Sequence, residues 1–324
     1  GCDGGVWKST NLGSNWLNLN STLEISNIYR IGTNTFNPDI IVAGVQDMGM
    51  GHRTNNGVAW YDYGRGADGG NFVFSKTLSN AGVGVETPQG QILYTTDAGN
   101  SLNSTSIPGI WDNQNDWLAP VVSHPTQEGV FYTSRRINTG TRVWKSTNNG
   151  QSWNGLQNDI PVSSPPQNIA LSTSDPNIMY VSMGSYVWPD MVSHIYRTTD
   201  EGETWSSNLM NNIPNRYISH LAVDPKNPNI VYATLSGFGT GHVFRTSNGG
   251  GNWVDISGTR PTVGDHFWVP NTPVNDLEIK YISATQKQLF IATDVGVLVG
   301  YDPPLPQFID QYHWNMVAEG LPTC

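Results

Sequence analysis

Residues 146–153 read STNNGQSW, and this octapeptide decides the fold because close copies of it return along the chain. In the form Ser/Thr-x-Asp/Asn-x-Gly-x-x-Trp it recurs as STNLGSNW (residues 9–16), TTDEGETW (198–205) and TSNGGGNW (246–253). Four matches with the same internal spacing indicate a repeated structural unit rather than a single loop.

Three weaker copies fill the remaining gaps: RTNNGVAW (53–60), TTDAGNSL (95–102), and a copy that starts at Gly300 and reaches Trp314 after an insertion. The last residue of each copy then falls at positions 16, 60, 102, 153, 205, 253 and 314. Steps of 42 to 61 residues suit a four-stranded propeller blade. We therefore predict an all-β, seven-bladed β-propeller. It spans residues 1–324 as one domain, has an incomplete first blade, and is a fragment of a larger protein.

The flanks of the copies support this prediction. Short β-type runs such as RVWKS (142–146) and VFRTS (243–247) precede the copies, and runs such as PNIVYATL (228–235) come earlier. Each unit thus has strands A, B and C, the octapeptide as the C–D turn, and strand D from the Trp.

The octapeptide has a physical role as a turn. Its Asp or Asn side chain accepts backbone N–H groups, its Gly supplies a positive φ, and its Trp is expected to be buried between blades. A metal or sugar site at each turn is the less favoured alternative. The predicted structural residues are Asn11, Trp16, Asn55, Trp60, Asp97, Asn148, Trp153, Asp200, Trp205, Asn248 and Trp253.

Composition excludes several classes of function. The net charge is −10 and no Lys/Arg cluster exists, so nucleic acid is not an expected partner. No apolar run suits membrane insertion, and the start of the chain does not read as a signal peptide.

We expect no metal and no cofactor, because the His residues are scattered and no acidic loop pattern occurs. Cys2 and Cys324 form either a disulfide or two ordinary thiols.

The four full copies resemble the Asp-box (BNR-type) repeats of sialidases, sortilin-type propellers and two-propeller xyloglucanases. Other segments resemble large secreted surface proteins of the Bacteroidetes, many of which are exported by the type IX route. These segments are VAGVQDMGMG (42–51), GRGADGG (64–70), and DVGVLVGYD (294–302) with EGLP (319–322). The resemblance implies an extracellular or cell-surface location in a bacterium, secreted or attached to the outer membrane. It also implies a glycan or extracellular protein, and other domains of the parent chain, as partners.

The B–C and D–A loops of a propeller share one face, where ligands usually bind. Several Trp side chains in these loops stand beside polar residues, an arrangement typical of carbohydrate sites. The alternative is that the rings only plug their loops. The candidate ligand-binding residues are Trp111, Asp112, Trp117, Arg135, Trp188, Asp190, Arg260, Asp265 and Trp268.

The leading functional interpretation is a non-catalytic recognition, adhesion or spacer module that binds glycan or protein through this face. The alternative is a glycoside hydrolase, xyloglucanase-like rather than sialidase-like, and a purely architectural role is a third option. Asp3 resembles the catalytic Asp of xyloglucanases, and Asp68 is a candidate partner. However, Asp47 and Asp294 occupy the same turn in other units, which favours turn chemistry. Xyloglucanases also take their second carboxylate from a second propeller.

A sialidase site is less favoured for a separate reason. Arg65, Arg135, Arg216 and Arg260 are the candidates for the arginine cluster that binds a sugar carboxylate. The Arg-Ile-Pro segment typical of sialidases is missing, and no Glu lies in a convincing position beside a Tyr.

Overall fold

The structure is a computed structural model that describes residues 7–11, 13–19, 27–53, 59–66, 68–87, 91–107, 118–184, 192–258, 268–303 and 312–317. The regular elements in these residues are β-strands, so the protein is all-β, and no α-helix occurs within those ranges. Within the same ranges, no helix has the length and apolar character needed to cross a membrane.

The strands follow one another as antiparallel meanders, which confirms the predicted strand–turn order. A hairpin of β1 (Trp7–Lys8) and β2 (Leu17–Asn18) comes first. The next group contains β3 (Ile28–Thr33), β4 (Ile41–Val45), β5 (Gly49–Arg53) and β6 (Tyr61–Asp62). It is followed by β7 (Asp68–Phe74), β8 (Gly82–Thr87), β9 (Gln91–Thr95) and β10 (Asn103–Thr105). One parallel bridge, Gly49 to Asp68, joins these two groups.

The remaining groups repeat the pattern. They are β11 (Val121–Ser123), β12 (Phe131–Ile137), β13 (Gly140–Ser146) and β14 (Asn154–Gly155), then β15 (Pro166–Leu171), β16 (Met179–Gly184) and β17 (Ser193–Thr198). After them come β18 (Ile218–Val223), β19 (Val231–Leu235), β20 (Val243–Thr246) and β21 (Trp253–Asp255). The last are β22 (Val274–Tyr281), β23 (Lys287–Thr293), β24 (Gly296–Asp302) and β25 (Asn315–Met316).

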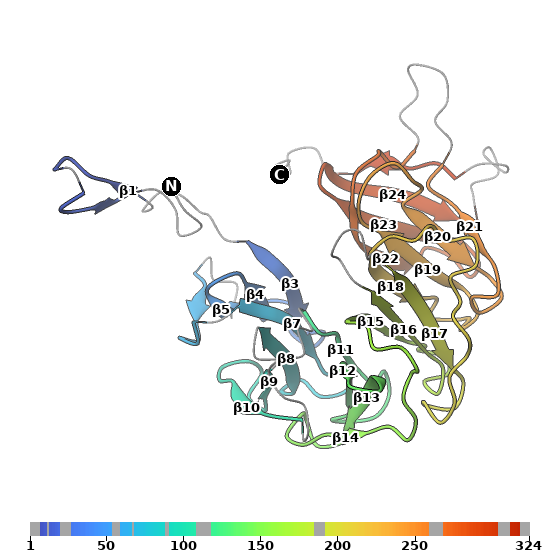
Figure 1. Ribbon diagram of the computed structural model, residues 1–324, viewed down its shortest axis with the longest axis horizontal. Coiled ribbons are helices and arrows are strands. Elements are labelled where there is room, and N and C mark those ends of the chain that lie inside the picture. Colours follow the sequence, from blue (N-terminus) through green and yellow to red (C-terminus); the bar gives the residue numbers. More distant parts are fainter. Residues whose placement is uncertain are drawn as a thin grey trace, which may run out of the picture.

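The groups from β3 to β25 are arranged around a common centre. Figure 1 shows the first strand of each group on the inner side, in the order β3, β7, β11, β15, β18 and β22. Hydrophobic clusters lie between neighbouring groups: Val83, Phe131 and Trp153 form one, and Tyr232 and Trp314 belong to another. The core is therefore divided into layers between sheets, as expected when sheets pack face to face around an axis.

The repeated turns have the predicted internal bonds. In the copy at 198–205, Oδ1 of Asp200 accepts the Thr204 N–H at 2.8 Å, and Oγ1 of Thr198 accepts the Gly202 N–H at 2.8 Å. Gly202 has φ +86°, which a side chain would strain. The prediction that the third residue accepts a backbone N–H in its own turn is confirmed at Asn11, Asp97, Asn148, Asp200 and Asn248.

Burial of the turn Trp residues is confirmed in part. Trp153 is 3% and Trp253 is 2% exposed, and Nε1 of Trp253 donates to Leu209 O of the preceding group. Trp205 is half-buried. The prediction was wrong for Trp16, which is 61% exposed, and Trp60 is also exposed. Figure 1 shows the β1–β2 hairpin apart from the other sheets, which agrees with the exposure of Trp16 directly before β2.

A β-bulge recurs near the start of five of the innermost strands. The pairing with the second strand skips Tyr29 on β3, Gln167 on β15, Ser219 on β18 and Asn275 on β22. On β7 the skip lies between Gly69 and Phe72. A bulge bends its strand and redirects the side chains beside it. These five bulges lie at the same end of the sheets and turn polar residues toward the centre.

Candidate functional site

One end of the sheets carries the connections predicted to bind ligands. We call it the loop face, and define it by the connections β4–β5, β6–β7, β19–β20, β21–β22 and β23–β24. Asp47 and Asp294 lie in two of these turns, as the repeat predicted. The innermost strands begin at this end, so their bulges lie beside the loops.

Most of the catalytic and ligand-binding candidates lie outside the described residues: Asp3, Trp111, Asp112, Trp117, Trp188, Asp190, Arg260 and Asp265. Cys2, Asn55 and Cys324 lie outside them as well. The structure places Asp68 at the start of β7 and a half-buried Trp268 just before β22, both at the loop face. Arg135 differs from its predicted place, because it lies within β12 and is only 2% exposed. Its place in a strand whose first five residues are all buried, rather than in a loop, accounts for that burial.

Asp68 is held by its neighbours at the loop face. Its Oδ1 accepts the backbone N–H of Asp47 at 2.6 Å, so it fixes the β4–β5 turn. Burial, followed by the negative charges of Asp68 and Asp47, raises the pKa of Tyr29. The glycine after Asp68 has a packing role, since a Cβ on Gly69 would lie 2.0 Å from Gly49 O. Asp68 and Gly69 thus bring two neighbouring groups of strands close together.

Other charged groups of this face are also paired. Nε of Arg65 lies 2.8 Å from Oε1 of Glu86, and its Nη2 donates to Gln91 Oε1 at 2.9 Å. Oδ1 of Asp294 accepts the side-chain amide of Asn275 at 2.9 Å. The carboxylates of Asp68, Glu86 and Asp294 therefore support the loops and the strand ends.

A cavity of about 140 Å³ lies at the centre, where the innermost strands begin. Every innermost strand contributes to its wall; the polar lining residues include Arg30, Asn71, Gln167, Asn168, His220 and Asp276. Sequence reasoning missed this site. The available signal was the run of polar residues in PQNIAL, ISHLAV and VNDLEI, where a regular strand would alternate.

Nδ1 of His220 contacts Oδ1 of Asp276 at this cavity. The Leu277 N–H also donates to Asp276 Oδ1 at 2.7 Å. Partial burial alone would raise the pKa of Asp276, but His220, the Leu277 N–H and the charge of Arg30 outweigh it and hold that pKa below its usual range. Asp276 is therefore a carboxylate at neutral pH.

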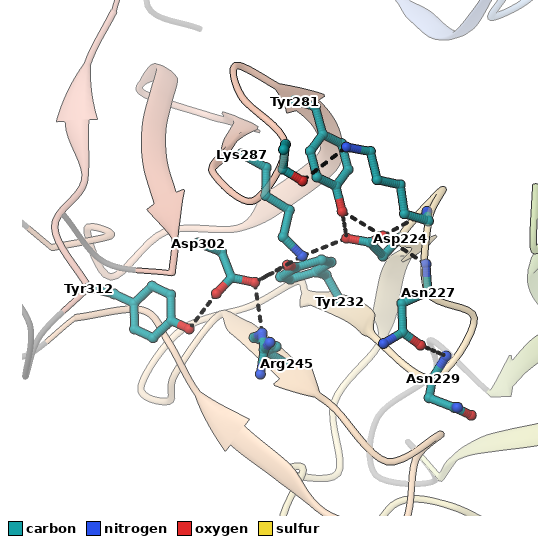
Figure 2. Close-up of polar contacts among 11 residues, drawn as sticks. Asp224, Asn227, Asn229, Tyr232, Arg245, Tyr281, Lys287, Asp302 and Tyr312 are labelled. Carbon is teal, nitrogen blue, oxygen red and sulfur yellow. Dashed lines mark hydrogen bonds and ion pairs between the residues drawn. The ribbon is translucent and has the colours of Figure 1, made fainter. Parts of the chain in front are cut away.

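A second cluster of charges lies at the opposite end of the sheets, between β18–β21 and β22–β25 (Figure 2). Lys287 Nζ lies 2.5 Å from Asp224 Oδ2 and 3.2 Å from Asp302 Oδ2. Arg245 Nε adds a contact of 2.8 Å to Asp302. Tyr232 donates to Asp302, and the Tyr281 hydroxyl lies 2.9 Å from both oxygens of Asp224; these partners were not found from sequence.

This cluster is structural, because its charges balance and its carboxylates are buried. Burial alone would raise the pKa of Asp302, but Tyr232, Lys287 and Arg245 hold it below its usual range. Burial alone would also raise the pKa of Asp224. The hydrogen bonds from Lys287 and from the Lys226 N–H outweigh burial and lower that pKa. The cluster joins two groups of strands rather than offering a group to a substrate.

No family model matches the chain. Among curated proteins, the chain is 25% identical over 257 residues to xyloglucanase Xgh74A of Acetivibrio thermocellus, which is 67% of this chain and 30% of that protein. It is 30% identical over 151 residues to a xyloglucanase of Hypocrea jecorina, covering 42% of this chain and 17% of the relative.

Solved structures show a similar fold. A GH74 enzyme of Niastella koreensis superposes with a TM-score of 0.66 at 16% identity, covering 89% of this chain and 46% of that one. An ancestral GH74 enzyme gives a TM-score of 0.67 at 17% identity, covering 96% of this chain and 43% of that one. The structure described as YCF48 bound to D1 peptide gives a TM-score of 0.56 at 13% identity, covering 90% of this chain and 82% of that one.

The protein is thus all-β and related in fold to the GH74 β-propeller enzymes. The relation to xyloglucanases extends to sequence. The chain spans less than a third of the length of the xyloglucanases that it matches, at 30% of Xgh74A.

Proposed function

We propose that this chain is a propeller of a xyloglucanase-like glycoside hydrolase and that it binds a xyloglucan-class β-glucan across the loop face. The observation that carries the proposal is the 257-residue similarity to Xgh74A, together with the GH74 propeller fold. Because fold alone does not fix function, the proposal also needs a site. We assign that site to the loop face, where Trp268 is the ligand-binding Trp candidate that lies within the described residues.

The same similarity supports a finer structural proposal. The recurring turns with their Asp or Asn bonds are Asp boxes, and the seven copies mark seven blades around one axis. In this proposal the β1–β2 hairpin is the incomplete first blade. The protein acts outside a bacterial cell, at the surface or secreted by the type IX route, beside other domains of the parent protein.

Asp3 is the catalytic candidate, and its assignment rests on the resemblance of CDGG to the xyloglucanase sequence. Asp68 is assigned to positioning, because its Oδ1 accepts the Asp47 N–H at 2.6 Å. Hydrolysis needs two carboxyl groups about 5–10 Å apart. The second group is expected from outside this propeller, so binding is the property that the chain has by itself.

A second candidate is recognition of glycan or protein without cleavage. It is favoured by Asp68 and Asp294, which support loops instead of facing one another as an acid–base pair. Incubation of the parent protein with xyloglucan distinguishes the two. Release of reducing ends that disappears in Asp3→Asn supports the hydrolase, and binding without release supports recognition.

Electrophoresis through native gels that contain a polysaccharide tests the proposal. The chain should be retarded by xyloglucan and should run unchanged through dextran, an α-glucan outside the proposed ligand class. Equal mobility in both gels would overturn the proposal.

A further inference from the structure

We propose that the central cavity of the loop face binds a single sugar ring through the polar side chains of the innermost strands. The inference rests on the proposed function for placing a glycan on this face. It deepens that function by naming a monosaccharide subsite at the centre of the face, apart from the loop residues that would hold a polysaccharide chain.

The unpaired amide of Gln167 is the first observation. Gln167 lines the cavity and is 8% exposed, yet neither Oε1 nor Nε2 has a hydrogen-bond partner among the described residues. An amide group has two donors and one acceptor with two lone pairs, and buried groups of this kind are normally satisfied. The cavity therefore presents donors and an acceptor that a polar ligand would satisfy.

The bulges are the second, independent observation. Four of them sit directly before Arg30, Asn168, His220 and Asp276, and each of these residues lines the cavity. One bulge would be a local irregularity. Because the bulges recur at the same end of successive strands, they form a ring of polar groups around one axis, as bulges do where they redirect side chains beside a site.

The chemistry of the wall selects a neutral, hydroxyl-rich ligand. The wall carries one arginine, Arg30, and one carboxylate, Asp276, so their charges cancel and leave none for an ion to neutralise. The two polar atoms of the Gln167 amide match hydroxyl groups, which both donate and accept, whereas Nδ2 of Asn71 already donates to Leu118 O and Ala119 O. Beside them, apolar residues such as Ile169 offer contact to the C–H face of a sugar.

The size of the cavity limits the ligand to one ring. Its volume of about 140 Å³ corresponds to about four to five water molecules at ~30 Å³ each. The hydroxyl groups of one pyranose would take the positions of such waters. A longer glycan would have to remain on the loops outside.

Saturation-transfer NMR with D-glucose and D-xylose tests the subsite. Wild type should transfer saturation to these sugars, and Gln167→Leu should weaken binding at least tenfold because it keeps the volume and removes both polar atoms. The melting temperature of Gln167→Leu should stay the same or rise, since an unpaired amide is removed. The matched control is Gln151→Leu, an exposed residue of a repeated turn at the other end of the sheets, which should bind like wild type.

Three results would overturn the inference: no transfer with wild type, undiminished transfer with Gln167→Leu, or binding of inorganic phosphate instead of sugar. If Gln167→Leu does not fold, Asp276→Asn serves as the second variant and should weaken sugar binding. Xyloglucan retardation is measured separately. Retardation without monosaccharide binding overturns the subsite alone, and loss of both overturns the proposed function.

Discussion

Lys287 Nζ lies 2.5 Å from Asp224 Oδ2, and both side chains are almost completely buried between two neighbouring groups of strands. Nζ also lies 3.2 Å from Asp302, so one ammonium group contacts two carboxylates (Figure 2). Replacing Lys287 would leave these carboxylates in a buried site with too little positive charge. The two groups of strands are therefore held together by a charge cluster in addition to apolar packing.

We predict that Lys287→Met lowers the free energy of unfolding by about 3–5 kcal/mol, the usual cost of breaking a buried ion pair from one side. Urea unfolding followed by Trp fluorescence measures it. The control is Lys280→Met on β22, which is exposed and should change the free energy by less than about 0.5 kcal/mol. Equal effects of the two variants would contradict the role of the cluster.

Stability should fall in acid because the pKa of Asp224 and of Asp302 is lowered in the folded protein. Such a carboxyl stabilises the fold fully above its unfolded pKa, about 3.9, and this contribution is lost as the pH falls through the lower folded value. Asp302→Asn should therefore be less stable than wild type at pH 7, and the difference should shrink below about pH 4. Urea midpoints from pH 7 to pH 3 measure this, and a constant difference would refute it.

The turn Trp residues should differ sharply in their contribution. Trp253→Ala should cost about 3–5 kcal/mol, because the ring is 2% exposed and its Nε1 donates to Leu209 O. Trp16→Ala should cost less than about 1 kcal/mol, because that ring is 61% exposed. Denaturant titrations of both variants test the contrast, and similar losses would show that the hairpin packs against another sheet.

Gly69→Ala should destabilise the protein by about 1–3 kcal/mol, since the added Cβ would lie 2.0 Å from Gly49 O and force β5 and β7 apart. Gly51→Ala on β5 is the matched control, because its Cβ would meet Tyr61 O at an ordinary 3.7 Å. Thermal unfolding of both variants is the measurement. An unchanged melting temperature for Gly69→Ala would remove the packing explanation of the ADGG segment.

The sequence predicted features that repeat locally and missed those that depend on neighbouring sheets. The bonds of Asp200 follow from one turn and were predictable. The exposure of Trp16 depends on where its hairpin lies, and the burial of Arg135 depends on the strand boundary of β12. The contact of Lys287 with Asp224 joins residues 63 positions apart in different groups, which the repeat does not encode.

The lining of the central cavity could not be predicted from the sequence for the same reason. Gln167 and Asp276 are polar residues in short strands, and their sequence alone allows either an exposed edge or an inward direction. Only the bulges, which appear in the strand pairing, turn them to the centre.

Calorimetric titration with a xyloglucan oligosaccharide tests the central claim, that the loop face binds a β-glucan, most directly. Wild type should bind, and Trp268→Ala at the loop face should weaken the affinity by about 1–2 kcal/mol, or about 5- to 30-fold. Asn148→Ala, in a repeated turn at the opposite end, should keep the wild-type affinity. No binding by wild type, or a loss in Asn148→Ala that Trp268→Ala does not share, would contradict the account.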